Sequence, residues 1–234
     1  DPAMHIHGLQ KLAMVDYPGK LAATVFTGGC NLRCPFCHNA LLVTRLAETP
    51  EIPEQEVLDF LASRRGLLDG VVLTGGEPLL QPDAADFLRK VRELGFAVKL
   101  DTNGCDPARL AEILNQGLVD YVAMDVKNAP ARYAETVGIP GFNPAPVEES
   151  IRLLRKSTVD YEFRTTLVRE LHRPEDLDAI AAWLAGAPRY YLLNFVDSGN
   201  LIGRGYHGFT AEQLQGFAER VRPFFGAVEL RGID

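Results

Sequence analysis

The sequence predicts an α/β fold built around a parallel sheet, from three observations. Six apolar, β-branched runs alternate along the chain with segments whose apolar residues recur at helical spacing. Polar motifs sit at or just after the ends of these runs, where α/β barrels and open α/β sheets build their sites. The 234 residues are 47% hydrophobic and 24% charged, which suits a domain with a substantial core.

The expected strands are the apolar runs, because β-branched and aromatic residues favour a pleated, buried surface. In chain order they span residues 21–27, 70–74, 96–100, 121–126, 161–168 and 190–195, with a last short strand at 227–230. A short amphipathic segment at residues 6–15 leads into the first strand and is closed by the turn residues 16–19.

The expected helices lie between the strands and span residues 53–65, 82–94, 107–116, 147–156, 174–184 and 210–221. Local signals support their ends. Pro53 suits a first helical turn, and Gly95 follows a helix end. Asp106 and Thr210 suit N-cap positions. The alternation of strands and helices implies right-handed crossovers between parallel neighbours.

The charge balance and the apolar pattern argue against several function classes. The 24 basic and 31 acidic residues give a net charge of −7, which indicates no broad nucleic-acid surface. No apolar run approaches roughly 18 residues, so we expect no membrane span, and no signal peptide is visible. Clustered cysteines without such a signal point to the cytoplasm. We expect a single domain over residues 1–234, with residues 1–3 (Asp-Pro-Ala) as a cloning remnant.

Residues 28–39 are the most informative stretch of the chain. Cys30, Cys34 and Cys37 follow the first expected strand with C-x3-C-x2-C spacing. Thiolates suit zinc, copper(I) and iron–sulfur clusters. A structural zinc site needs four ligands, and His38 adjoins Cys37, a spacing that would strain a closed tetrahedron. We therefore favour a 4Fe–4S cluster with one iron open to a ligand, ahead of zinc and of plain buried cysteines.

This motif resembles that of the radical S-adenosylmethionine (SAM) superfamily, and its Cys-His-Asn ending resembles activating enzymes of glycyl radical enzymes. The chain looks most like activating proteins of anaerobic ribonucleoside-triphosphate reductase, which share the pyruvate formate-lyase activase pattern. The resemblance spans residues 8 to about 194. It implies an α/β fold with a radical SAM core, an incomplete (β/α)6 TIM-type barrel that is open along one side.

The resemblance also implies a reaction. A reduced 4Fe–4S cluster and S-adenosyl-L-methionine would yield a 5′-deoxyadenosyl radical, which takes a hydrogen atom from a glycine of a partner glycyl radical enzyme. A flavodoxin- or ferredoxin-type protein would donate the electron, and no catalytic side chain is needed beyond the cluster. The alternatives are an activase of pyruvate formate-lyase or of another glycyl radical enzyme, a radical SAM enzyme that acts on a small molecule, an iron–sulfur electron carrier, and a zinc-binding module.

Three later motifs allow a structural as well as a functional interpretation. Residues 75–78 (Gly-Gly-Glu-Pro) fit a turn with positive φ, or a loop whose backbone approaches a ligand closely. Asp101 ends a buried strand, where an unpaired carboxylate is costly. Asp125 and Lys127 lie two apart on a strand, so they either pair with each other or bind ribose hydroxyls and a carboxylate respectively.

The resemblance assigns roles to these residues. It implies that Gly76 contacts the methionine amino group, that Lys127 pairs with the methionine carboxylate, and that Asp125 accepts from the ribose. In some members the aspartates Asp101 and Asp125 also hold a monovalent cation. The expected cofactor contacts are Phe36, His38, Gly75, Gly76, Glu77, Asp101, Asp125 and Lys127, and the expected cluster ligands are Cys30, Cys34 and Cys37. The family's histidine near the end of the sixth strand is absent here, which leaves Asn194 or Asp197 to replace it.

The resemblance assigns no fixed role to three further features of the sequence. Arg164 lies inside an expected strand and either balances Asp101 or Asp125, or positions cofactor or peptide. Cys105 lies apart from the triplet, and we interpret it as a small buried apolar residue. Residues 203–208 match the dinucleotide pattern G-x-G-x-x-G but do not directly follow a strand, so we expect a mobile loop at the barrel mouth.

Overall fold

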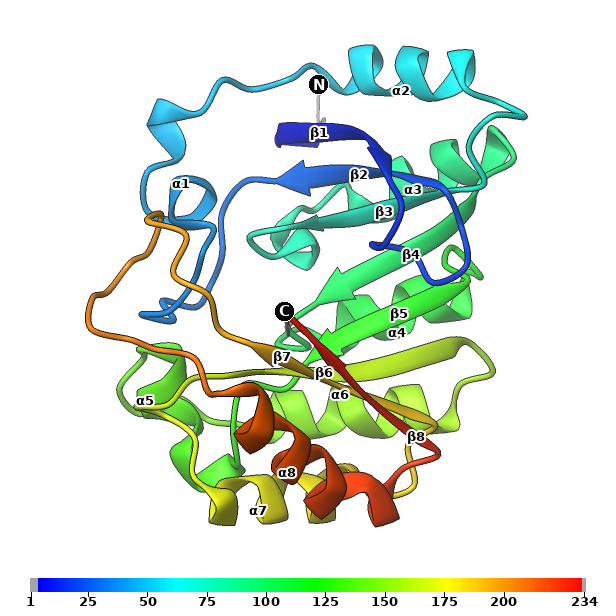
Figure 1. Cartoon of the computed structure of the whole chain (residues 1–234). Helices are drawn as coiled ribbons and strands as arrows, with labels where there is room; N and C mark the ends of the chain where they lie inside the picture. Colours follow the sequence, from blue (N-terminus) through cyan, green and yellow to red (C-terminus); the bar gives the residue numbers. More distant parts are fainter. Residues whose placement is uncertain (1–3, 233–234) are drawn as a thin grey trace.

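The computed structural model describes residues 4–232, and the suggested cloning remnant at residues 1–3 lies outside this range. One eight-stranded sheet follows the order of the chain from β1 to β8 (Figure 1). Its strands are β1 (Ile6–Ala13), β2 (Ala22–Thr27), β3 (Gly70–Gly75), β4 (Ala97–Thr102), β5 (Tyr121–Asp125), β6 (Asp160–Leu167), β7 (Arg189–Asn194) and β8 (Ala227–Arg231). All neighbours from β2 to β8 are parallel, which confirms the expected α/β class.

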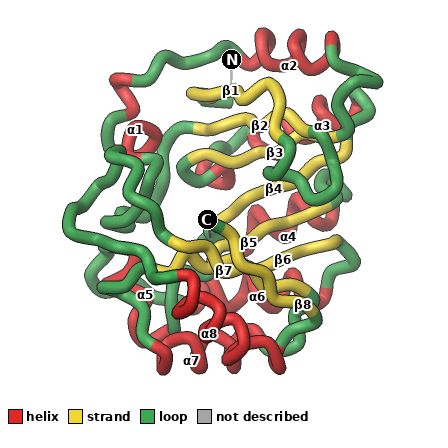
Figure 2. Tube along the Cα trace, in the orientation of Figure 1, coloured by secondary structure: helices red, strands yellow, loops and turns green. Residues whose placement is uncertain are grey.

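The strand order identifies the architecture as a partial barrel. A doubly wound sheet reverses its order at a switch point, whereas a barrel adds each strand beside the preceding one. The edge strands β1 and β8 are not paired with each other within residues 4–232, so the barrel is open on one side. Figures 1 and 2 show the strands curving around a common centre with the helices outside them.

The helices alternate with the strands as expected. They are α1 (Ala40–Val43), α2 (Glu54–Ser63), α3 (Ala84–Glu93), α4 (Pro107–Asn115), α5 (Tyr133–Val137), α6 (Ala145–Lys156), α7 (Pro174–Leu184) and α8 (Ala211–Val221). Only the short helices α1 and α5 were not predicted. The side chains of Asp106 and Thr210 accept hydrogen bonds from the first turns of α4 and α8, which confirms both N-caps. No helix within residues 4–232 is long and apolar enough to cross a membrane.

The amphipathic segment at residues 6–15 contains strand β1. Its sequence pattern did not indicate whether it forms a strand or a helix. β1 pairs antiparallel with β2, and register shifts interrupt the pairing between Ile6 and Gly8 and between Gln10 and Ala13. Because of these shifts, the side chains do not alternate regularly between buried and exposed positions along the strand. The partial barrel of β2 to β7 is extended by β1 at one edge and by β8 at the other.

The register of the parallel strands brings the polar motifs to one rim. Thr27 is aligned with Gly75 across β2 and β3, and Asp125 with Arg164 across β5 and β6. Each of these residues lies at or near the carboxyl end of its strand, apart from Arg164, which lies in the middle of the longer β6. Carboxyl ends of parallel strands meet at one edge, so loops from distant parts of the chain converge there.

Candidate active site

The loop between β2 and α1 carries the three clustered cysteines, and backbone hydrogen bonds connect it to two other segments of the protein. At its start Gly29 has a φ of +91°, a conformation that favours glycine. The N–H of Arg33 donates to the carbonyl of Val137 at the end of α5, 2.9 Å away. The carbonyl of Pro35 accepts from the N–H of Gly203, 2.6 Å away. The loop is thus held between α5 and the segment that follows β7.

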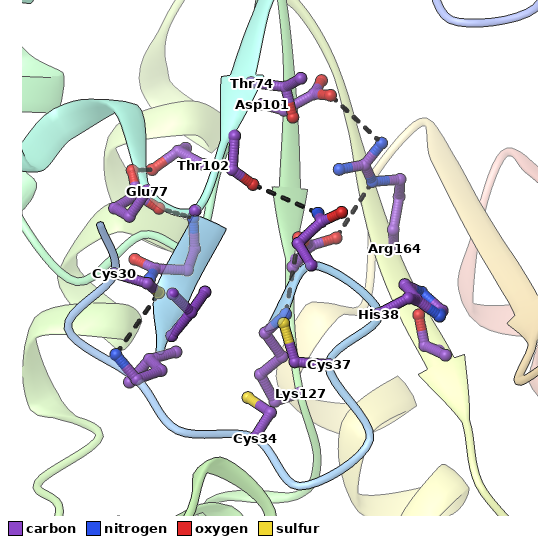
Figure 3. A pocket seen from close by; sticks show the side chains of 18 of the residues that line it. Cys30, Cys34, Cys37, His38, Thr74, Glu77, Asp101, Thr102, Lys127 and Arg164 are labelled. Carbon is purple, nitrogen blue, oxygen red and sulfur yellow. Dashed lines mark hydrogen bonds and ion pairs between the residues drawn. The ribbon is translucent and has the colours of Figure 1, made fainter. Parts of the chain in front are cut away.

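The side chains of Cys30, Cys34 and Cys37 line one pocket at the rim of the barrel (Figure 3). Burial raises the pKa of the Cys30 thiol and raises that of Cys34 to about 11. Both thiols therefore hold their protons at neutral pH until a metal replaces them. The Cys30 sulfur also accepts a hydrogen bond from the N–H of Leu32 at 3.4 Å.

The donor set fits the expected iron–sulfur cluster. Three soft thiolate ligands come from one short loop and face one pocket, and the fourth cysteine, Cys105, is not among the residues that line it. Within residues 4–232 no three His, Cys, Asp or Glu side chains are arranged to hold a single metal ion. A 4Fe–4S cluster is wider than one ion, because each thiolate binds a different iron atom.

Gly75 and Gly76 form the wall of the pocket next to the cysteine loop. Gly75 has a φ of +143°, and a Cβ atom there would lie 2.4 Å from the backbone nitrogen of Thr27. A Cβ atom on Gly76 would lie 2.1 Å from the carbonyl oxygen of Gly29. Both glycines are therefore required by close backbone approach: a larger residue at Gly75 would collide with the end of β2, and one at Gly76 would collide with the start of the cysteine loop.

The carboxylate of Glu77 points into the protein, where both of its oxygens accept hydrogen bonds (Figure 3). The donors are the N–H of Leu79 at 3.1 Å, the hydroxyl of Thr102 at 2.8 Å and the N–H of Asn103 at 2.6 Å. Burial raises the pKa of Glu77 to about 7, although these hydrogen bonds oppose the shift. Glu77 thus joins the loop after β3 to the loop after β4.

Two aspartates and three basic residues form a charged group on the inner wall of the barrel. Lys99 lies 2.9 Å from Asp101. The Arg164 guanidinium lies 3.8 Å from Asp101 and 3.1 Å from Asp125 (Figure 3). Lys127 lies 3.6 Å from the other oxygen of Asp125. The structural role considered for Arg164 is thus present, because it pairs with both aspartates.

Opposite charges within this group keep Asp125 and Lys127 ionised despite their burial. Burial opposes ionisation of Asp125, yet the charges of Arg164 and Lys127 outweigh it and lower the pKa of Asp125. Burial likewise opposes the charge on Lys127, and Asp125 outweighs it and raises the Lys127 pKa. Lys127 and Arg164 are cations of this group that line the pocket, which suits an anionic ligand.

The backbone of Lys127 is held on both sides by buried residues. Its N–H donates to the hydroxyl of Tyr133 at 3.0 Å, and its carbonyl accepts from Nε2 of His172 at 2.8 Å. Nδ1 of His172 accepts from the N–H of Val168 at 3.0 Å, so the ring is neutral and protonated on Nε2. Burial lowers the pKa of His172, in agreement with this state.

The segment after β7 covers one side of the pocket. The ring of His38 stacks on Phe195 with a centroid distance of 6.2 Å, and the carbonyl of His38 accepts from the side-chain amide of Asn200 at 3.0 Å. His207, at the other end of this segment, is exposed and pairs with Glu170. The mobility predicted for residues 203–208 stays a prediction. In this structure Gly203 is hydrogen-bonded to Pro35 of the cysteine loop, and the carbonyl of His207 accepts from the N–H of Arg169.

The predicted site residues come together in this single pocket. Its lining includes Cys30, Cys34, Phe36, Cys37, His38, Gly75, Gly76, Glu77, Asp101, Asp125, Lys127 and Arg164. Asn194 and Asp197 do not line it. The Asn194 amide exchanges hydrogen bonds with the backbone of Phe209 at 3.0 and 2.9 Å, so it is not free to replace the missing histidine. Asp197 instead accepts from the N–H of Gly199.

Several lining residues were missed by sequence reasoning. They are Leu32, Asn39, Val43, Thr74, Thr102, Asn103, Thr166 and Leu193. Thr74 and Thr102 lie at or next to strand ends that carry other site residues, and this position is the signal that identifies them. Thr166 follows Arg164 by two residues on β6 and faces the same way. No sequence signal marks Leu193 or Val43.

Comparisons with known proteins agree with this geometry. The model of the Radical SAM superfamily matches residues 24–184. A Methanocaldococcus jannaschii protein, named as a candidate glycyl-radical enzyme activating enzyme, is 36% identical over 197 residues, which cover 81% of this chain and 79% of the relative. The pyruvate formate-lyase-activating enzyme of Clostridium pasteurianum is 35% identical over 128 residues, covering 53% of this chain and 52% of that enzyme.

Solved structures share the fold at low sequence identity. Streptococcus suis SuiB bound to S-adenosylmethionine has a TM-score of 0.67 at 17% identity, covering 86% of this chain and 48% of SuiB. Native anSMEcpe with bound AdoMet has a TM-score of 0.63 at 18% identity, covering 87% of this chain and 61% of that one. This chain thus spans about half to three fifths of these two structures. Motif, pocket and sequence match agree, and the chain belongs to the Radical SAM superfamily of enzymes.

Proposed function

We propose that this protein is an activating enzyme for a glycyl radical enzyme. The observation that carries the proposal is one pocket in which three cysteine thiols face a glycine backbone wall and the Asp125–Lys127 pair. The first part suits a cluster with an open iron, and the second suits a zwitterionic amino acid bound to a nucleoside. The named relatives at 35–36% identity support the choice of activase among radical SAM functions.

Different residues are proposed to bind different parts of the cofactors. Cys30, Cys34 and Cys37 would hold the 4Fe–4S cluster, which in its reduced state would supply the electron for cleavage of the sulfur–carbon bond of S-adenosylmethionine. Lys127, which lines the pocket and lies 3.6 Å from Asp125, would pair with the methionine carboxylate.

The pocket wall and its inner acids complete the site. The backbone around Gly76 faces the methionine amino group, and Asp125 accepts from the ribose hydroxyls while Arg164 keeps it ionised. Phe36 and His38, which line the pocket, would contact the cofactor, and Glu77 would hold the loop after β3 against the loop after β4. A monovalent cation near Asp101 stays a prediction, since Lys99 and Arg164 already flank that carboxylate.

The open side of the barrel suits a protein substrate. β1 and β8 are not paired with each other within the described residues, and we propose that an extended loop of the partner reaches the rim from this side. A glycine α-hydrogen is a chemically reasonable target, since the flanking amide and carbonyl stabilise the radical and no side chain blocks approach. We propose anaerobic ribonucleoside-triphosphate reductase as the partner, a flavodoxin- or ferredoxin-type electron donor, and a cytoplasmic location.

Pyruvate formate-lyase is the second candidate partner, because activating enzymes of that protein are among the relatives. The test is anaerobic incubation of the reduced protein with S-adenosylmethionine and each partner in turn, followed by electron paramagnetic resonance. We expect a doublet on one partner that disappears when its C-terminal loop glycine is replaced by alanine. Rapid cofactor cleavage on a small metabolite, with no doublet on either partner, would contradict the activase assignment and leave the cluster chemistry intact.

A further inference from the structure

Asn103 lies between the cysteine loop and the loop after β4, and its side-chain nitrogen faces Cys30. Nδ2 lies 3.9 Å from the Cys30 sulfur and 2.9 Å from Oδ1 of Asn31, and both contacts are hydrogen bonds. Asn103 is 5% exposed and is one of the residues that line the cysteine pocket. The two hydrogens of Nδ2 thus have two acceptors, one of which is a predicted cluster ligand.

The orientation of this amide is fixed by the rest of its contacts. Oδ1 of Asn103 accepts from the N–H of Cys105 at 3.0 Å, which leaves only the nitrogen to face Cys30. The backbone N–H of Asn103 donates to the buried Glu77 carboxylate at 2.6 Å. An Asx turn explains the oxygen but not the nitrogen, so the turn alone does not account for asparagine here.

We propose that Asn103 is a positioning residue for the iron–sulfur cluster, which donates an N–H···S hydrogen bond to the Cys30 ligand and thereby raises the reduction potential of the cluster. A thiolate gains electron density when the cluster is reduced, so a hydrogen bond to its sulfur stabilises the reduced state more than the oxidised one. The N–H of Leu32 donates to the same sulfur at 3.4 Å, so Cys30 accepts both a backbone and a side-chain hydrogen bond. The inference rests on the proposed cluster site.

The side-chain hydrogen bond reaches Cys30, one of the three predicted cluster ligands. Within the described residues, no side-chain hydrogen bond is formed to the sulfur of Cys34 or Cys37. Glu77 supports the contact indirectly, because it anchors the backbone from which the Asn103 side chain extends. The loop after β4 thus controls the electronic environment of a ligand that lies 73 residues earlier in the chain.

The test compares reconstituted wild type with Asn103→Ala and Asn103→Asp by redox titration of the cluster, monitored by electron paramagnetic resonance. Asn103→Asp keeps the acceptor for the Cys105 N–H but removes both N–H donors. We expect both variants to bind iron and sulfide like the wild type and to have a more negative midpoint potential, with the larger shift in Asn103→Asp because of its charge. An unchanged potential in both variants would overturn the proposal.

The matched control is Asn31→Ala, which removes the other acceptor of the same amide and leaves the Cys30 contact. Its potential should stay close to that of the wild type. If Asn31→Ala instead shifts the potential as much as Asn103→Ala, loop geometry rather than the hydrogen bond is responsible, and the proposal is wrong.

A direct readout is electron–nuclear double resonance of the reduced wild type labelled with ¹⁵N-asparagine. A ¹⁵N coupling that is lost in Asn103→Ala would support the hydrogen bond, and its absence in the wild type would contradict it. These measurements concern the cluster alone, so they are separate from the activase test. A protein with a full cluster but no glycyl radical product would fail the proposed function and leave the potential shifts intact.

Discussion

At the scale of single residues, the four cysteines differ in what their thiols face. Cys30, Cys34 and Cys37 line the pocket, whereas the Cys105 thiol lies near the carbonyl of Asn103, and burial raises its pKa to about 12. Replacing any of the first three with alanine should abolish the iron content and S-adenosylmethionine cleavage, because each iron needs its thiolate. Cys105→Ala is the matched control and should keep both. Loss of iron in Cys105→Ala but not in Cys37→Ala would show that the ligands are wrongly assigned.

The Asp125–Lys127 pair is the second residue-scale feature. Lys127→Ala and Asp125→Asn should weaken binding of S-adenosylmethionine without changing iron content. Loss of one charge-assisted hydrogen bond costs about 1.5–3 kcal/mol, which corresponds to roughly a tenfold to hundredfold lower affinity. Equilibrium dialysis under anaerobic conditions measures this change. If both variants bind as tightly as the wild type, the pair serves only the internal balance with Arg164.

At the scale of elements, Glu77 joins the loops after β3 and β4 and makes that connection sensitive to pH. Its pKa is about 7 in the folded protein and about 4.5 in the unfolded chain. Between these values the folded state binds the extra proton, so this group's contribution to stability is full below about pH 4.5 and is lost as pH rises through 7. The loss amounts to about 3 kcal/mol at most.

Glu77→Gln cannot titrate, and it provides the comparison for this prediction. The difference in free energy of unfolding, wild type minus variant, should decrease between pH 5 and pH 8 in urea titrations. Glutamine also places its amide nitrogen near a backbone donor, the N–H of Leu79 or of Asn103, so the variant is expected to be less stable than the wild type at pH 5. Parallel stability curves across this range would mean that Glu77 does not titrate there.

The elements also show what the sequence could and could not predict. The parallel strands were predictable because each is an apolar run closed by turn residues, and the cysteine motif with its glycine loop identified the rim. The register that aligns Asp125 with Arg164 was not predictable, since pairing depends on contacts between segments far apart in the chain. The same holds for the Gly203–Pro35 hydrogen bond and for the role of Asn103.

At the scale of the whole molecule, the open barrel has to stabilise its last strand without a partner on the far side. β8 pairs only with β7 in the described sheet, and its Arg231 reaches back toward Glu162 on β6 with an N···O distance of 3.9 Å. The guanidinium also lies over the ring of Tyr191, 3.9 Å from the centroid. Glu162 is fully buried, and its other oxygen accepts from the hydroxyl of Tyr121 at 2.8 Å.

Arg231 is therefore predicted to fix β8 by compensating a buried carboxylate. Arg231→Met should lower the free energy of unfolding by about 1–3 kcal/mol, below the range for fully buried pairs because the Arg231 side chain is 34% exposed. The double variant Arg231→Met with Glu162→Gln removes the uncompensated charge and should recover part of this loss. Chemical denaturation of the four proteins gives the coupling energy between the two sites. A coupling near zero would mean that the stacking on Tyr191, rather than the ion pair, holds the last strand of the open barrel.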